Sequence, residues 1–238
     1  MSHVAARIGT IAAVFLLLFG TFAVSVRPVG AQSSELLFAF SGTVKTGPST
    51  GTTLEGDLAL TPAADGTVSG ELRIGDTAIP VSGRLSGTQI SVSFDLGDGV
   101  YIFGIGRLGP SGNFRGPFVG PQDGDQGSWI AKPITEVTYN FSGTVERGPS
   151  TGTTLAGPLF LRIIDNRFTG ALTIGDTEIP VRGRVINENG ATSINIFFNL
   201  GNDVQIFGQG TADADGNFSG SFRGPDQHDR GTWTATLP

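Results

Sequence analysis

The chain contains two copies of one long unit, and this duplication constrains the fold more than any other feature of the sequence. The octapeptide GPSTGTTL at Gly47–Leu54 returns unchanged at Gly148–Leu155. Further motifs return in the same order, namely FSGTV, IGDT-x-IPV, GNF-x-G and G-[ST]-W. The unit is too long for a solenoid repeat and has the size of a whole domain. The pattern predicts two tandem domains, at residues 36–132 and 138–238.

Within each unit, apolar and polar residues alternate with a period of two, which is typical of half-buried β-strands. The segment Ile90–Leu96 reads ISVSFDL, with an apolar residue at every second position. No segment of either unit shows a helical period. Turn signals rich in Gly and Asp separate the runs. We expect strands in the first unit near residues 36–45, 53–61, 66–75, 77–86, 88–96, 99–108, 112–119 and 127–132.

Short links between consecutive strands predict antiparallel neighbours, hence a meander. Glycines on the apolar face of these strands favour closure, because a strand can bend sharply where no side chain intervenes. We therefore predict an all-β chain of two tandem small antiparallel up-and-down barrels of about eight strands each, with a β-sandwich as the alternative. The glycines are Gly42, Gly56, Gly70, Gly83 and Gly116, matched by Gly143, Gly157, Gly170, Gly183 and Gly220.

A short meander that ends in a G-[ST]-W strand resembles calycin-type barrels such as those of the avidin group. The resemblance implies a calycin-like architecture and includes no ligand-binding motif, because each unit has one tryptophan, Trp129 or Trp233. Both are expected to plug a barrel end, with ligand contact as the alternative. The phenylalanines of the first unit are expected to fill the interior: Phe38, Phe40, Phe94, Phe103, Phe114 and Phe118.

The repeated octapeptide is a candidate binding loop, because backbone amides of Gly-rich loops can hold phosphate and hydroxyls can contact a sugar or an ion. It lacks the Lys-Ser/Thr pair and the following helix of a phosphate-binding loop. Gly, Pro, Ser and Thr are also ordinary turn residues. We interpret the loop as structural, with its residues Gly47, Pro48, Ser49, Thr50 and Gly51 and their copies Gly148, Pro149, Ser150, Thr151 and Gly152.

Candidate metal ligands are sparse. Asp123 and Asp125 are two residues apart, as in many calcium loops, but the second copy replaces Asp123 by Gln227. His228 is the only histidine outside the N-terminal segment, and no G-x-S-x-G motif surrounds a serine. We predict no metal, no cofactor and no catalytic residue.

Composition excludes further classes of function. The chain has no cysteine, so disulfides and thiolate chemistry are excluded. Its net charge is −6, and Lys and Arg are scattered rather than clustered. A nucleic-acid partner is therefore not expected.

The N-terminus has the features of an export signal. Arg7 precedes the uncharged segment Ile8–Val26, and Val29 and Ala31 stand at positions −3 and −1 of a cleavage site before Gln32. We predict a helical signal peptide at residues 1–31, with a retained membrane anchor as the alternative. The protein would then be secreted or held at the cell surface or envelope, with membrane contact only if this segment is retained.

These observations predict an exported, non-enzymatic protein with a structural or interaction role at the cell exterior. Two alternatives stay open: a protein that binds a small apolar ligand inside each barrel, and a barrel enzyme that acts at one open end. Because the link at residues 132–137 is short, we also expect the first repeat to pack against the second.

Overall fold

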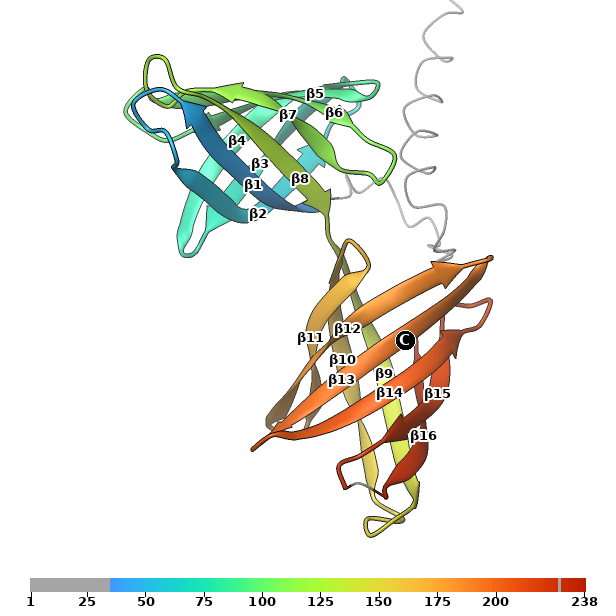
Figure 1. The fold of residues 1–238 in the computed structure, drawn as a ribbon. Coiled ribbons are helices and arrows are strands. Elements are labelled where there is room, and N and C mark those ends of the chain that lie inside the picture. The colour runs from blue at the N-terminus through green and yellow to red at the C-terminus, as the bar shows by residue number, and fades with distance from the viewer. Residues whose placement is uncertain (1–34, 227) are drawn as a thin grey trace, which may run out of the picture. The chain divides into compact units, whose positions relative to one another are not determined.

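The computed structural model describes residues 35–226 and 228–238, and these fold into two closed antiparallel β-barrels (Figure 1). Each barrel has eight strands, so the predicted fold class is confirmed and the sandwich alternative is wrong. The predicted signal helix at residues 1–31 lies outside the described residues. Within the described part of the chain, no helix is long and apolar enough to cross a membrane.

The first barrel is a meander in which each strand pairs with the next. It closes because β1 pairs with β8 as well as with β2, for example through Phe40 opposite Ala131. Its strands are β1 (Leu36–Thr46), β2 (Thr53–Pro62), β3 (Thr67–Ile74), β4 (Thr77–Ser86), β5 (Gln89–Asp95), β6 (Tyr101–Leu108), β7 (Phe114–Val119) and β8 (Gln126–Pro133).

The second barrel repeats this order and closes through β9, which pairs with both β10 and β16. Its strands are β9 (Thr135–Arg147), β10 (Thr154–Ile164), β11 (Arg167–Ile174), β12 (Thr177–Glu188), β13 (Ala191–Gly201), β14 (Val204–Ala212), β15 (Phe218–Arg223) and β16 (Arg230–Thr236). The boundary between the two compact units falls between Ile134 and Thr135.

The core of each barrel consists of the alternate side chains that point inward. Leu58, Leu72 and Ile90 are at most 2% exposed in the first barrel. The prediction for the phenylalanines is confirmed for Phe38, Phe40, Phe94, Phe114 and Phe118, which are all buried. It is wrong for Phe103, which is 54% exposed, because Ile102 and Gly104 take the inward positions of β6.

Most of the inward-facing glycines stand where two strands approach closely. A Cβ atom at Gly56, Gly70, Gly83 or Gly116 would overlap a backbone carbonyl oxygen of the neighbouring strand, and the equivalent glycines of the second barrel behave alike. Gly42 and Gly143 differ, since a Cβ there would first meet the rings of Phe40 and Phe141. The close strand approach explains why these corners need glycine.

The extra residues of the second copy lengthen a hairpin. Alignment of the two copies places the main insertion around residues 186–192 and predicts a loop there, but this prediction is wrong. β12 and β13 extend through it as paired strands, with Glu188 opposite Ala191. Asn189 and Gly190 turn the chain with φ of 52° and 78°, as a tight two-residue hairpin requires.

Candidate functional site

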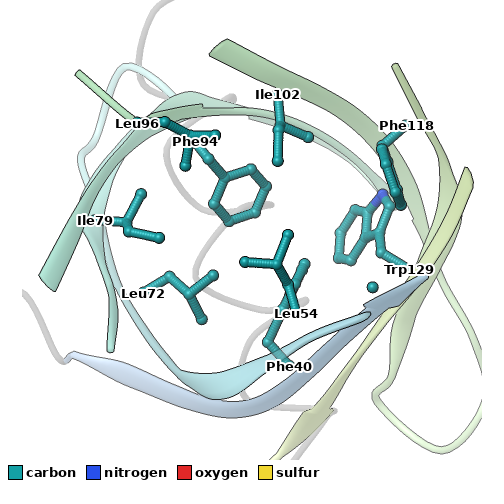
Figure 2. A pocket seen from close by; sticks show the side chains of 10 residues that line it. Phe40, Leu54, Leu72, Ile79, Phe94, Leu96, Ile102, Phe118 and Trp129 are labelled. Carbon is teal, nitrogen blue, oxygen red and sulfur yellow. The ribbon is translucent and has the colours of Figure 1, made fainter. Parts of the chain in front are cut away.

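The barrel interiors are filled by side chains. Figure 2 shows Phe94, Ile102, Leu72 and Trp129 pointing into the centre of the first barrel. The cavity left among them is about 10 Å³, and the corresponding cavity of the second barrel has the same volume. Such a space holds roughly one water molecule. Among the described residues, the space that these side chains leave in each barrel is therefore too small for a small apolar ligand.

The two tryptophans, which the sequence marks as candidate ligand contacts, are part of this packing. Trp129 is 4% exposed, stacks on Phe40 with ring centroids 5.9 Å apart, and donates its Nε1–H to the Pro117 carbonyl at 3.1 Å. Trp233 repeats these contacts with Phe141 and Ser221. The Trp129 indole lies against Gly104 and Gly106 of β6, where a side chain would collide with it.

The repeated octapeptide is tied to the end of its barrel by a buried carboxylate. Asp125 is 1% exposed and accepts hydrogen bonds from the backbone N–H groups of Ser49 at 2.9 Å and Gln122 at 3.1 Å. Asp229 makes the equivalent bonds with Ser150 and Asp226. Gly47 has a φ of 106° and directly faces Asp125, so a side chain there would collide with the carboxylate.

These bonds also decide the charge of the carboxylates. The Ser49 backbone N–H is the main reason that the pKa of Asp125 lies below its ordinary value of 3.8. For Asp229, burial alone would raise the pKa, but the Ser150 hydrogen bonds and the other donors outweigh it, so the pKa is again lowered. Both side chains are thus ionised acceptors for a loop, and the contacts favour the structural interpretation of the octapeptide.

A metal interpretation finds no support in the geometry. Within the described residues, no three His, Asp or Glu side chains converge as metal ligands do. Asp123, the proposed partner of Asp125 in a calcium loop, is exposed.

The pKa shifts predict acid sensitivity. A carboxyl whose folded pKa is lowered contributes stability above its unfolded pKa, and this contribution disappears as the pH falls through the folded value. Asp65 and Asp213, whose pKa values are lowered mainly by side-chain hydrogen bonds from Thr67 and Asn217, add to the effect of Asp125 and Asp229. We expect melting temperatures that change little between pH 7 and 5 and fall below about pH 4.

The contribution of one carboxylate can be measured with Asp125→Asn. Its amide can accept the Ser49 bond but presents N–H groups to the Gln122 donor, so the melting temperature of the first barrel should fall by about 5–10 °C at pH 6. Asp123→Asn is the control, because it removes the same charge from an exposed side chain. Equal melting temperatures for the two variants at pH 6 would contradict the structural role of Asp125.

An apolar patch lies on the outside of the first barrel, on β6 and β7. Phe103 on β6 is 54% exposed, and Val119, which lies opposite it on β7, is 49% exposed. Ile105, the next outward residue of β6, is 50% exposed. Tyr101 extends the patch, with its ring 5.9 Å from that of Phe103, and exposed Pro117 completes it. We call these five residues the outer patch. Contiguous exposed apolar side chains of this kind are typical of binding surfaces.

Two arginines border the outer patch. Arg107 lies opposite Arg115 on the same outer face, and both are exposed. Beyond them, the register places Gln89 beside Arg107 and Ile130 beside Arg115, so no carboxylate flanks the pair on the neighbouring strands. A surface groove of about 430 Å³ is lined by both arginines together with Ile105, Leu108, Pro110 and Pro117.

The second barrel has a polar surface at the same place. Its strands β14 and β15 pair Phe207 with Arg223, Gln209 with Ser221, and Thr211 with Ser219. The Arg223 guanidinium stands 5.0 Å from the centroid of the Phe207 ring, which also packs on Phe197 at 4.8 Å. Apart from Phe207, these paired outward positions of β14 and β15 carry none of the apolar residues of the outer patch, and no two arginines lie opposite each other on them.

Sequence reasoning missed the outer patch, although a signal was present. The segment Tyr101–Ile105 reads YIFGI, so its inward and its outward positions both carry apolar residues. A half-buried strand is normally apolar only at the positions that point inward. The corresponding segment of the second unit, QIFGQ, is polar at two of the outward positions. Comparison of the outward positions of the two copies would have identified the outer patch.

No protein-family model matches the chain, and no curated protein sequence matches it. Among solved structures, a candidate outer membrane protein of Bacteroides fragilis has 14% identity, covering 87% of this chain and 97% of that chain at a TM-score of 0.32. The Burkholderia oklahomensis agglutinin has 13% identity, with coverage of 86% and 97% and a TM-score of 0.22.

The Myxococcus xanthus hemagglutinin, solved in complex with a mannopentaose, has 14% identity, with coverage of 85% and 100% and a TM-score of 0.24. At these identities and TM-scores, the similarities say nothing about what this chain binds.

Proposed function

We propose that the protein is an exported, non-enzymatic binding protein whose interaction surface is the outer patch of the first barrel. The export signal predicted at residues 1–31 supports a location at the cell exterior. The observation that carries the proposal is the exposure of Phe103, Ile105 and Val119 side by side on one sheet face.

The filled interior supports this choice over a carrier with an internal ligand. Sites for small ligands usually have volumes of roughly 300–1,000 Å³, whereas the cavity in each barrel is about 10 Å³. An enzyme at an open barrel end is less well supported, because the buried carboxylates there, Asp125 and Asp229, are already bound by backbone donors.

The difference between the barrels also supports a role for the patch. The two copies share their inward residues on these strands, for example Ile102 with Ile206 and Phe118 with Phe222. They differ at the outward positions of Tyr101, Ile105, Pro117 and Val119. Because the fold tolerates the polar version, the apolar side chains of the first barrel are not required for folding.

Binding of the neutral dye Nile red tests the proposal. We expect one site per chain, whereas ligand sites inside both barrels would give two. The variant Y101Q/I105Q/V119R carries the residues that the second barrel has at these positions, and should weaken dye binding at least about tenfold while leaving the fold intact.

The reciprocal variant Q205Y/Q209I/R223V is the matched control and should create a second dye site on the second barrel. Circular dichroism checks that both variants keep their strands. Dye binding that is unchanged in Y101Q/I105Q/V119R would overturn the proposed function.

A further inference from the structure

We infer that the outer patch and the arginine pair together form a site for an anionic amphiphile, a single molecule with a negatively charged head group and an apolar chain. The inference rests on the proposed function and names the ligand class of the same surface.

The arrangement of the side chains has two chemically distinct ends. Across β6 and β7, the pair Phe103 and Val119 is followed by Ile105 and Pro117 and then by the pair Arg107 and Arg115. Outward residues along a strand are spaced by roughly 7 Å. An apolar surface thus continues directly into a doubly cationic one.

The arginine pair is unfavourable for the isolated protein. Like charges directly opposite each other on a sheet repel and destabilise the pairing. Within the described residues, neither guanidinium of the pair makes a hydrogen bond or an ion pair. The second barrel shows that Thr211 and Ser219 serve the fold at these positions. An anion bound between the two guanidinium groups would relieve the repulsion.

The groove beside the pair has the capacity for such a head group. Its volume of about 430 Å³ is within the range of small-molecule sites. Carboxylate, phosphate and sulfate accept two parallel hydrogen bonds from a guanidinium. Ile105 and Pro117 belong both to the groove and to the outer patch, so a chain attached to the head group would continue over apolar side chains.

A single amphiphile fits better than an anionic bilayer. The chain as a whole carries a net charge of −6, so an extended anionic surface repels it, while one head group meets only the local arginine pair.

Calorimetric titration of the exported chain with decanoate below its aggregation limit tests the inference. We expect one site per chain and affinity about tenfold or more above that for decyltrimethylammonium, which has a chain of similar length and the opposite charge. Acetate, the head group alone, should give no measurable heat.

The variant R107T/R115S, which carries the residues of the second barrel, should reduce the preference for decanoate over decyltrimethylammonium to about twofold or less. The control R73T/R84S removes the same charge from β3 and β4 of the first barrel and should keep the preference.

Three results would overturn the inference: an unchanged preference in R107T/R115S, two decanoate sites per chain, or binding to phosphatidylglycerol vesicles without binding of monomeric decanoate. The last result would identify a membrane surface instead. In each case, a Nile red site that is still lost in Y101Q/I105Q/V119R leaves the proposed function standing, so the two failures are distinguishable.

Discussion

Replacement of Trp129 by alanine is expected to lower the free energy of unfolding of the first barrel by about 3–5 kcal/mol. The side chain is 4% exposed, and its indole fills the space directly above Gly104 and Gly106, where a Cβ atom would collide with it. Its loss leaves a cavity against Phe40 and removes the hydrogen bond to the Pro117 carbonyl. Denaturant unfolding followed by far-ultraviolet circular dichroism measures the change.

Tyr101→Ala is the matched control, because it removes an aromatic ring that is 40% exposed from the same barrel, and should change the stability by about 0.5 kcal/mol or less.

In the Trp129→Ala variant, Trp233 is the single tryptophan, so its fluorescence reports on the second barrel alone. A midpoint for Trp233 that falls with that of the first barrel would indicate that the two repeats unfold together.

The sequence was sufficient to predict the barrel because the barrel depends on the alternation of apolar and polar residues along each strand. The run expected at residues 77–86 is β4, Thr77–Ser86, and the glycine positions that favoured closure are those where strands approach too closely for a side chain. A period of two assigns each residue to the inside or outside. Eight short strands that must all bury their alternate apolar side chains have few possible arrangements other than a closed meander.

The same alternation gave a wrong prediction at β6, because apolar residues on both faces of this strand do not show which face points inward. Phe103 and Ile102 are both large and apolar, and only the neighbouring strands determine that Ile102 points inward. Phe103, the central ring of the outer patch, was therefore expected in the core. A surface that binds a partner violates the usual polarity of outward positions, so a simple pattern conceals it.

The buried aspartates show a second limit. Asp125 was considered as a metal ligand because sequence spacing shows which oxygens are close along the chain, but not which backbone N–H groups reach them from a loop 76 positions away. The signal lay in the comparison of GPQDGDQG with GPDQHDRG, where Asp125 and Asp229 persist while most of their neighbours differ.

A second large effect is expected from Gly116→Ala, which should destabilise the first barrel by about 3 kcal/mol. The new Cβ would overlap the carbonyl oxygen of Ile105 and stand 2.9 Å from its carbonyl carbon. Both atoms belong to the backbone of β6, so relief requires β6 and β7 to separate. Thermal and denaturant unfolding measure the loss.

Gly109→Ala is the control, since its Cβ would meet only the Asn113 carbonyl oxygen at 3.6 Å, an ordinary contact. Gly116 lies between Arg115 and Pro117, so separation of the strands also disrupts the outer patch, the proposed binding surface. Gly116→Ala should therefore lose stability and Nile red binding together, whereas Y101Q/I105Q/V119R loses binding alone. Full dye binding in a destabilised Gly116→Ala barrel would place the site elsewhere than on the paired outer faces of β6 and β7.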